Sequence, residues 1–303
     1  MNDMNIFCVI VTYNGMKWID KCLSSILSSS IHITPIVVDN NSADNTAEYI
    51  LSNYPNTILM KSHINLGFGQ ANNKGIQYAL QNGATHVLLL NQDAWIAPDM
   101  IEKMLPYMDN HSLISPLHMT GKGDRMDTNF CKHAVMRSPE LERLQNDWTV
   151  GQTNKYYTDE INAACWLLPR VVIEEIGGFN PLFFHYAEDN DYLQRIHYHQ
   201  KGIYFIPSAR VFHDRENIAV KCPSMQSIYQ NLILRAVNIN YCTLHCLFIR
   251  WRYVLAVIHT AIRERRIKDI QYLIQALMRY HTMHRAIHNN RKTLKTKGAH
   301  WIS

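Results

Sequence analysis

The 303-residue sequence lacks two features that would direct a protein into or across a membrane. No apolar run approaches the ~18 residues that a spanning helix needs. The first apolar segment, Ile6–Val11, is not preceded by the basic stretch of a signal peptide. We therefore expect a cytoplasmic protein without a membrane-spanning helix.

Cysteine is used in a way that excludes two common kinds of site. The seven cysteines are an odd number, and no two of them are spaced as CxxC. Zinc ribbons and thioredoxin-like redox centres depend on that spacing. Exported proteins usually pair their cysteines, so the odd count also favours a reducing compartment.

Two nucleotide-binding motifs are missing: the P-loop GxxxxGK[ST], and a GxGxxG that opens the first helix. The segment Asn65–Gly75 contains glycines and leads into a predicted helix. Gly67 and Gly69 let the backbone approach a ligand closely. Free N–H groups at the start of the helix can bind phosphate or a sugar hydroxyl, so the segment is a candidate ligand site of another kind.

The net charge of +5 divides into two unequal parts. Residues 241–303 hold 12 lysines and arginines against two acids, a net of +10, and residues 1–240 hold 18 against 23, a net of −5. A basic end of this kind indicates an anionic surface, either membrane or nucleic acid. The apolar share of 47% is enough for a large core.

Short apolar runs alternate with helical patterns, which predicts an α/β fold with a mainly parallel sheet flanked by helices. The runs lack polar alternation, as is typical of strands buried on both faces. The strand candidates are Ile6–Val11, Pro35–Val38, Thr57–Met60, His86–Leu90, Ile203–Ile206 and Arg210–Phe212. The helix candidates are Lys17–Ser28, Thr46–Asn53, Ala71–Gln81, Arg170–Ile176 and Tyr192–His199. Residues 110–160 are interpreted as irregular.

Polar residues follow three of the predicted strands, at the sheet edge where ligands bind. They are Thr12-Tyr13-Asn14-Gly15, Asp39-Asn40-Asn41-Ser42 and Asn91-Gln92-Asp93. Any strand can end in polar turn residues, but three such loops at one edge indicate a site. Asp93 is suited to hold a hard divalent cation, although a helix-capping role fits it equally well.

Acids and a histidine in the second half of the chain add candidate chemistry. Glu188, Asp189 and Asp191 lie just before a predicted helix, where they can cap it. The aromatic residues that precede them would raise the pKa of a neighbouring carboxyl group, as suits a general base. His213 follows a predicted strand and is either a metal ligand or an ordinary core or surface residue.

Taken together, these segments resemble the family 2 glycosyltransferases, and within them the rhamnosyltransferase-like enzymes. The resemblance covers about residues 4–240. The segments that carry it are Val11–Gly15, Val38–Ser42, Asn65–Gly75, Asn91–Asp93, Gly177-Gly178-Phe179 with Glu188-Asp189, and His213.

The resemblance implies a GT-A fold with a donor pocket and a divalent cation, Mg²⁺ or Mn²⁺. Asp93 matches the last acid of the DXD metal motif, in which Asn91 here replaces the first acid, and His213 matches the additional metal ligand. Donor-binding roles fall to Thr12, Asp39, Asn41, Asn65, Gly67, Gly69, Asn91 and Trp166.

Asp189 matches the catalytic base of the family, six residues before Arg195. Glu188 and Asp191 are expected to support it or to contact the acceptor. The implied reaction is an inverting transfer from a nucleotide-diphosphate sugar to a glycan or lipid-linked acceptor, in the synthesis of a cell-surface polysaccharide. The expected division is 1–240 for the transferase (1–110 for the donor, 111–240 for the acceptor) and 241–303 for a basic helical tail.

Two other functions fit part of the sequence. Sugar-nucleotide nucleotidyltransferases share the general sheet, but Val9–Lys17 lacks their phosphate-binding loop. A nucleic-acid-binding protein would explain the basic tail, but the body is acidic and no recognised RNA module is present. We therefore expect no nucleic-acid partner.

The tail has an apolar stripe at helical spacing, and it has two interpretations. The stripe consists of Leu244, Leu247, Phe248, Trp251, Val254, Leu255, Ile258, Ala261 and Ile262, and a similar pattern follows from Ile267 to Met278. These helices either pack on protein or lie on the anionic inner face of the cell membrane. The second interpretation predicts a peripheral membrane protein that binds through residues 244–303.

Overall fold

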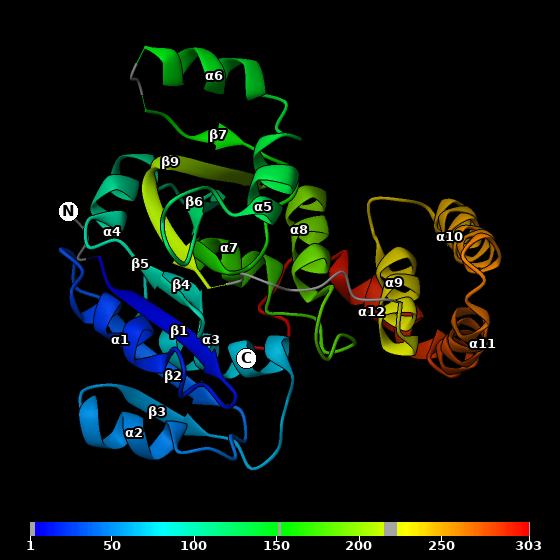
Figure 1. The fold of residues 1–303 in the computed structure, drawn as a ribbon, viewed down its shortest axis with the longest axis horizontal. Helices are drawn as coiled ribbons and strands as arrows, with labels where there is room; N and C mark the ends of the chain where they lie inside the picture. The colour runs from blue at the N-terminus through cyan, green and yellow to red at the C-terminus, as the bar shows by residue number, and fades with distance from the viewer. Residues whose placement is uncertain (1–3, 151–152, 215–222, 303) are drawn as a thin grey trace.

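The computed structural model describes residues 4–150, 153–214 and 223–302. Its centre is a sheet with the strand order β3-β2-β1-β4-β8-β6-β9-β5, and β7 pairs with β9 (Figure 1). The strands are β1 (Ile6–Thr12), β2 (Thr34–Asp39), β3 (Ile58–Lys61), β4 (His86–Asn91), β5 (Ala94–Ile96), β6 (Ser112–Thr120), β7 (Tyr156–Tyr157), β8 (Cys165–Pro169) and β9 (Gly202–His213).

Helices cover both faces of this sheet, so the predicted α/β architecture is confirmed. Those of the first half are α1 (Ile19–Leu27), α2 (Thr46–Asn53), α3 (Phe68–Gln81), α4 (Met100–Met104), α5 (Thr128–Phe130) and α6 (Leu141–Thr149). Those of the second half are α7 (Arg170–Ile176), α8 (Glu188–Tyr198), α9 (Met225–Val237), α10 (Thr243–Arg263), α11 (Ile267–Thr282) and α12 (His284–Leu294).

The first four strands of the chain form the parallel half of the sheet. Strands β1, β2 and β4 are buried between α1, α2 and α4 on one face and α3, α7 and α8 on the other, whereas β3 is a partly exposed edge strand. Their carboxyl ends therefore meet at one edge, as the polar loops predict. Strand β8 then joins the sheet antiparallel to β4 and β6.

The second half of the sheet differs from the prediction in two places. Residues 110–160 were expected to be irregular, yet β6 is a long buried strand within them. Pro116 lies inside β6, where it conceals the strand signal because proline cannot donate to a ladder. The pairing of β6 with β9 shifts beside Pro116, and β9 runs as one strand through the gap between its two predicted pieces.

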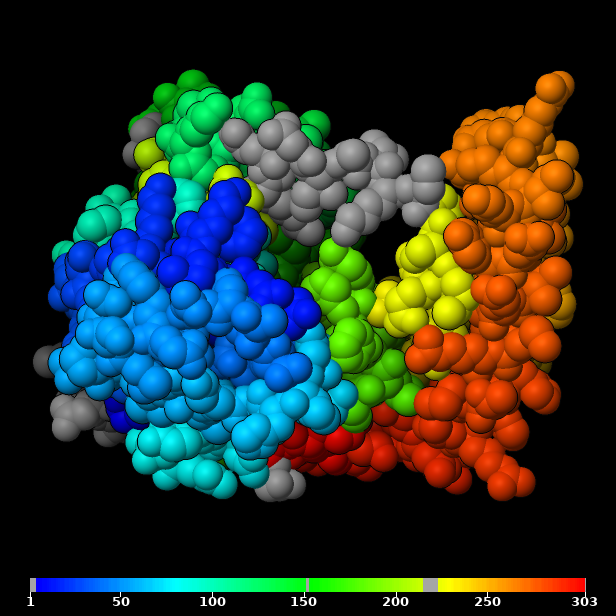
Figure 2. All heavy atoms as spheres, turned by 60° about the horizontal axis from the view of Figure 1, so that its bottom comes forward, coloured from blue at the N-terminus to red at the C-terminus, as the bar shows by residue number. Residues whose placement is uncertain are grey.

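The C-terminal helices form a third core that begins before residue 241. Buried side chains of α9, α10, α11 and α12 pack together with Phe183. The chain then returns to the sheet: the amide of Gly178 donates to the carbonyl of His300 (2.8 Å), and Ile302 is buried in the main core. Helices α10 and α11 form the edge of the molecule farthest from the N-terminal half (Figures 1 and 2).

Two expectations about the cellular environment can be compared with the described residues. None of their helices combines the length and apolarity needed to cross a bilayer. Six of the seven cysteines lie within the described ranges, and all six are free thiols.

Candidate active site

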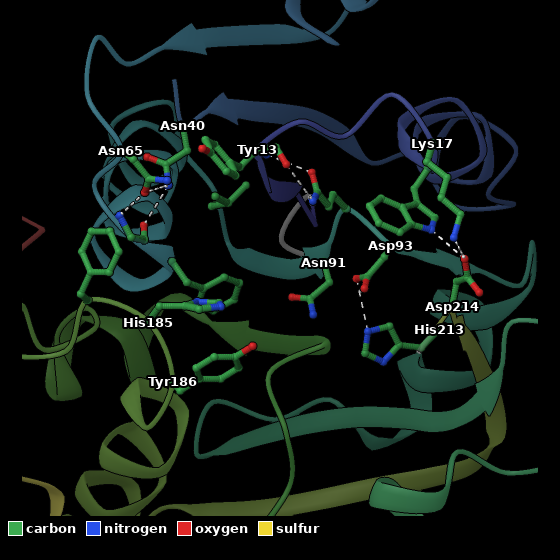
Figure 3. A pocket seen from close by; sticks show the side chains of 16 residues that line it. Tyr13, Lys17, Asn40, Asn65, Asn91, Asp93, His185, Tyr186, His213 and Asp214 are labelled. Atoms are coloured by element: carbon green, nitrogen blue, oxygen red, sulfur yellow. Dashed lines mark hydrogen bonds and ion pairs between the residues drawn. The ribbon is translucent and has the colours of Figure 1, made fainter. Parts of the chain in front are cut away.

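A cavity of about 660 Å³ lies at the predicted edge of the sheet. Figure 3 shows Asn40 and Asn65 at one end of it, Asp93, His213 and Lys17 at the other, and Asn91 between them. The lining residues are Val11, Tyr13, Lys17, Trp18, Asn40, Asn65, Gly67, Phe68, Asn91, Gln92, Asp93, Phe184, His185, Tyr186, His213 and Asp214. Its size and its mixture of aromatic and polar groups are typical of small-molecule sites.

Gln92 joins two of the three predicted loops. Its side-chain carbonyl accepts hydrogen bonds from the Thr12 hydroxyl (2.7 Å) and the Tyr13 amide (3.0 Å). Its amide nitrogen donates to the Tyr13 carbonyl (3.3 Å). Thr12 is fully buried and Tyr13 lines the cavity, so Thr12 acts here by fixing the loop at the end of β1.

Asn40 and Asn65 shape the other end of the cavity. The Asn40 amide donates to the Asn65 side-chain carbonyl (3.0 Å), and the Asn40 carbonyl accepts from the Leu66 amide (2.7 Å). Asn65 also accepts from the Gly67 amide (2.9 Å). These bonds tie the end of β2 to the loop that precedes α3, so two segments 25 residues apart form one wall.

Gly67 is required at its position for two reasons. Its φ is +78°, and a Cβ there would collide with the carbonyl oxygen of Phe184. The same carbonyl accepts a hydrogen bond from the Phe68 amide (3.1 Å). The loop before α3 thus packs directly on the aromatic segment that lines the cavity from the opposite side.

We predict that Gly67→Ala destabilises the protein more than Gly83→Ala. Both glycines have φ near +80°, so each alanine costs about 1–2 kcal/mol of backbone strain. Only Gly67 has a backbone atom in the way, since the nearest atom to a Cβ at Gly83 lies at 3.8 Å. Overpacking should lower the free energy of unfolding of Gly67→Ala by about 1–3 kcal/mol more than that of Gly83→Ala, as measured by urea unfolding. Equal losses for the two variants would contradict this contact.

Two of the residues predicted to bind the donor, Asp39 and Asn41, do not line the cavity. Asp39 is 4% exposed, and its Oδ1 is buried with no hydrogen-bond partner among the described residues. Asn41 is exposed, with φ at +68°. Asn40, between them, is the residue of this loop that reaches the cavity, because side chains alternate in direction at the end of a strand.

Asp93 and His213 meet at the other end of the cavity, as predicted. Their Oδ1 and Nε2 atoms lie 3.3 Å apart, with His213 buried and Asp93 partly exposed. Pairing of β5 with β9 sets His213 opposite Ala94, and the Asp214 amide donates to the Asp93 carbonyl (2.9 Å). Two residues 120 positions apart in sequence are therefore held together by backbone bonds.

Three residues beside this pair were not predicted as site residues. Trp18 Nε1 donates to Asp214 Oδ2 (2.7 Å), and Lys17 Nζ lies 3.1 Å from the same oxygen. The hydrogen bond from Trp18 and the charge of Lys17 lower the pKa of Asp214. In the sequence, the position of Asp214 directly after His213 is the one feature that connects Lys17, Trp18 and Asp214 to the site.

The segment Phe184–Asn190 borders two cavities. Phe184, His185 and Tyr186 line the large one, whereas Asp189 and Asn190 line a smaller one of about 190 Å³. Oδ1 of Asp189 accepts hydrogen bonds from the amide (2.8 Å) and the side chain (3.2 Å) of Asn190. The structure therefore puts the predicted base in the smaller cavity.

A match to a family model decides which class of protein this is. The model described as Glycosyl transferase family 2 matches residues 7–174. The chain belongs to glycosyltransferase family 2. It is therefore a sugar-transferring enzyme, and the nucleotidyltransferase and nucleic-acid-binding alternatives have no support.

Two curated relatives place this glycosyltransferase among rhamnosyltransferase-like enzymes. N-acetylglucosaminyl-diphospho-decaprenol L-rhamnosyltransferase from Mycobacterium tuberculosis is 25% identical over 242 residues, which are 71% of this chain and 78% of the relative. The dTDP-rhamnosyl transferase RfbF from Shigella flexneri is 27% identical over 223 residues, covering 72% of this chain and 71% of the relative.

A solved structure confirms the predicted GT-A fold. The mannosyltransferase PcManGT from Pyrobaculum calidifontis, in complex with GDP-Man and Mn²⁺, superposes with a TM-score of 0.59 at 15% identity. The match covers 91% of this chain and 86% of that one. At this identity the likeness concerns the fold alone.

Glu188 is the most perturbed acid near the cavities of this glycosyltransferase. It is 5% exposed, and its Oε2 has no hydrogen-bond partner among the described residues. Burial, and then the charges of Asp189 and Asp191, raise the pKa of Glu188 to about 8. The raised pKa favours the protonated form of Glu188 near neutral pH, which reduces the negative charge beside Asp189.

The raised pKa predicts how stability depends on pH. The folded state holds the Glu188 proton up to about pH 8, whereas the unfolded state releases it near the ordinary value of 4.5. Stability should therefore fall as pH rises between these two values. The melting temperature of Glu188→Gln should fall less over this pH range than that of the wild type, because glutamine does not titrate. If the melting temperatures of the wild type and of Glu188→Gln fall equally with pH across that range, the prediction is contradicted.

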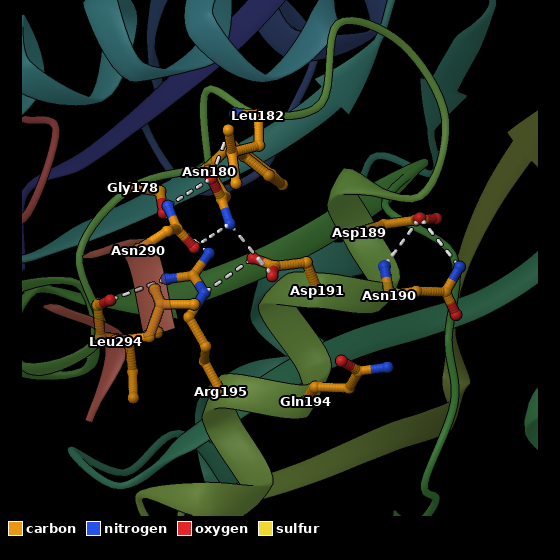
Figure 4. Close-up of polar contacts among 12 residues, drawn as sticks. Gly178, Asn180, Leu182, Asp189, Asn190, Asp191, Gln194, Arg195, Asn290 and Leu294 are labelled. Atoms are coloured by element: carbon orange, nitrogen blue, oxygen red, sulfur yellow. Dashed lines mark hydrogen bonds and ion pairs between the residues drawn. The ribbon is translucent and has the colours of Figure 1, made fainter. Parts of the chain in front are cut away.

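Asp191 supports the helix that carries the predicted base. Its carboxylate accepts hydrogen bonds from Arg195 Nε (2.9 Å) and from Asn180 Nδ2 (3.2 Å). Asn180 in turn exchanges two amide hydrogen bonds with Asn290 of α12 (Figure 4). Arg195 donates its remaining bonds to the carbonyls of Ile176 and Gly178. The C-terminal segment is thus bonded to the first turn of α8.

Trp166 does not line the large cavity. It is fully buried on β8, where its ring stacks on Phe179 at 6.2 Å and packs against Tyr192 at 5.7 Å. The prediction that it abuts the donor sugar does not fit this position, because a fully buried ring has no surface for a ligand. Gly69 is likewise a packing position, since a Cβ there would lie 2.8 Å from Phe179 Cβ.

Proposed function

We propose that this family 2 glycosyltransferase moves a sugar, with inversion, from a nucleotide-diphosphate donor to a glycan or lipid-linked acceptor in the synthesis of a cell-surface polysaccharide. The observation that carries the proposal is the 660 Å³ cavity, which has an amide-rich end and an acidic end. A nucleotide sugar fits these two ends, with its base and ribose at the amide-rich end and its diphosphate at the acidic end, where a divalent cation and Lys17 would offset the like charges.

The donor would lie with its nucleoside at the Asn40–Asn65 end. Asn40 and Asn65 offer donors and acceptors there, and the unpartnered Oδ1 of Asp39 is a further buried acceptor close to that loop. Asn91 lies midway and has a buried Oδ1 without a partner among the described residues. It would contact the ribose or the first phosphate.

The Asp93–His213 pair fits a divalent cation, Mg²⁺ or Mn²⁺. A carboxylate oxygen and an imidazole nitrogen are suitable ligands. No third acid, histidine or cysteine completes a cluster with them in the described ranges, so donor phosphates and water would provide the remaining ligands. When bound, the cation would neutralise charge on the departing diphosphate. Lys17 would add positive charge at the same end.

Asp189 would accept the proton of the acceptor hydroxyl. The oxygen then forms a bond to the anomeric carbon while the bond from that carbon to the diphosphate oxygen breaks, so a single displacement inverts the configuration. The smaller cavity suits the acceptor because its lining, which includes His133, Glu160 and Asn162, comes entirely from residues 111–240. That range is the predicted acceptor half.

The acceptor is proposed to be lipid-linked, which would bring the enzyme to the cytoplasmic face of the membrane as a peripheral protein. The support is the relative from Mycobacterium tuberculosis, whose name specifies a diphospho-decaprenol substrate. For the donor, dTDP-rhamnose is the first candidate, because the relative from Shigella flexneri is named as a dTDP-rhamnosyl transferase.

A thermal-shift screen tests the donor directly. The full chain is melted with dTDP-rhamnose, UDP-, GDP- and dTDP-hexoses, each with Mg²⁺, with Mn²⁺ or with a chelator. We expect one nucleotide class to stabilise the protein, and more so with cation. Transfer of that sugar to a diphospho-lipid acceptor, with NMR of the new anomeric centre, then tests inversion. No stabilisation by any nucleotide sugar would refute the donor assignment.

A further inference from the structure

Helix α10 has an apolar stripe that faces solvent. Leu244, Phe248, Trp251, Leu255 and Ile262 recur at spacings of three, four and seven residues, which places them on one side of the helix. Each of them is more than half exposed. The nine-residue stripe seen in the sequence is therefore divided, because Val254 and Ala261 are buried on the inner side.

Helix α11 continues this surface. Ile267, Ile274 and Met278 share one side of it, and each is more than half exposed. Its inner side buries Leu273 and Ala276 in the core shared with α9. The two helices therefore already have their protein contacts on the inside. The outward residues, here named the outer face, are Leu244, Phe248, Trp251, Leu255, Ile262, Ile267, Ile274 and Met278.

Positive charge accompanies the outer face. Arg252 and Lys268 are exposed, and the Arg252 guanidinium lies 5.7 Å from the ring of Phe248. The two acids of residues 241–303 are both neutralised by arginine: Glu264 by Arg263 (3.2 Å) and Arg266 (3.0 Å), and Asp269 by Arg266 (2.9 Å). Within residues 241–302, which the structure describes, no unpaired acidic side chain therefore opposes an anionic partner.

We propose that the outer face docks the enzyme on an anionic lipid bilayer. Exposed Trp, Phe, Leu and Ile beside Arg and Lys are the side chains that insert at a lipid interface. The net charge of +10 of this region attracts acidic headgroups and repels a second copy of itself. The inference deepens the proposed function, on which it rests for a lipid-linked acceptor, by assigning the membrane contact to this surface.

Vesicle flotation of the full chain tests the assignment. Vesicles of phosphatidylcholine are compared with vesicles that also contain phosphatidylglycerol. The variant Trp251→Glu/Leu255→Glu changes the outer face, and Trp148→Glu/Leu51→Glu is the matched control, since all four residues are about equally exposed and the added charge is the same. Thermal melts establish that each variant is folded. A third variant, Arg252→Gln/Lys268→Gln, removes charge alone.

We expect the wild type and the control to float with the anionic vesicles, and Trp251→Glu/Leu255→Glu to bind them at least about tenfold more weakly. The Arg252→Gln/Lys268→Gln variant should show a weaker preference for anionic over neutral vesicles than the wild type, because it removes two of the positive charges beside the outer face. Equal flotation of all variants would overturn the proposal. A wild-type dimer in light scattering that the Trp251→Glu/Leu255→Glu variant dissociates, without vesicle binding by either, would assign the outer face to a second copy instead.

Transfer to a water-soluble acceptor, measured on the same proteins, separates the two proposals. Trp251→Glu/Leu255→Glu should keep this activity, because no residue of α10 or α11 is among the described residues that line the two cavities. If no protein transfers sugar while flotation follows the expected pattern, the proposed function fails and the docking surface stands.

Discussion

Replacing Asp189 by asparagine should abolish sugar transfer and leave donor affinity unchanged. Asparagine keeps the size and the polar contacts of the side chain but cannot accept the acceptor proton. Losing a positioned base lowers a rate by roughly 10²–10⁴-fold. Donor binding should survive because Asp189 lines the smaller cavity and not the one proposed for the donor. Product formation and donor calorimetry measure the two effects separately.

The matched control for this variant is Glu160→Gln. Glu160 lines the same small cavity, but it is paired with His133 (3.1 Å) and Arg137 (2.9 Å) at the surface. Because Glu160 lines the proposed acceptor cavity but is not the proposed base, its replacement should change the KM for the acceptor and leave kcat near the wild-type value. Turnover by Asp189→Asn at the wild-type rate would remove Asp189 from the mechanism. A large loss in Glu160→Gln alone would identify a different base.

Local elements of the fold could be predicted wherever one physical signal was dominant. The predicted helices Thr46–Asn53 and Arg170–Ile176 match the observed ones to the residue. The central parallel strands β1, β2 and β4 were visible because burial on both faces makes them uniformly apolar. Strand β6 was missed because Pro116 breaks the signal, although the register shift beside that residue accommodates it in the sheet.

The site could be predicted only in part, because sequence motifs do not show side-chain direction. Asp93 and His213 were paired through the family resemblance, and the pairing of β5 with β9 gives the physical reason. Asp39 and Asn41 were chosen for a cavity that Asn40 lines instead. Lys17 and Trp18 carried no motif, and they join the site through a carboxylate, Asp214, almost 200 residues away in sequence.

The tail helices show that an apolar pattern in the sequence does not determine which side of a helix packs on protein. An apolar stripe at helical spacing does not indicate which side of the helix meets protein when both sides are apolar. In α10 the inner side packs around Val254 and Ala261, and Trp251 and Leu255 remain outside. The two interpretations of the tail were therefore not exclusive, since protein packing occupies one side and leaves the other for a partner.

Replacing Asp93 by alanine should weaken donor binding and remove its dependence on cation. Asp93 supplies a carboxylate oxygen, Oδ1, that lies 3.3 Å from His213 Nε2. Loss of groups that merely orient metal ligands costs about 10–100-fold in metal affinity, so loss of a ligand should cost at least as much. Calorimetry with the nucleoside diphosphate, with and without Mn²⁺, measures the effect. The gain in affinity that Mn²⁺ gives the wild type should vanish in the variant.

Asp99→Ala controls for the loss of a carboxylate near the same segment. Asp99 forms an exposed ion pair with Lys103 (2.6 Å) and lies outside both cavities. Its replacement should leave the Mn²⁺-dependent gain intact. If Asp93→Ala binds the nucleotide as tightly as the wild type does, with the same response to Mn²⁺, the acidic end of the cavity is not where the diphosphate binds. Lys17 would then have to be reassigned together with Asp93, because both line that end.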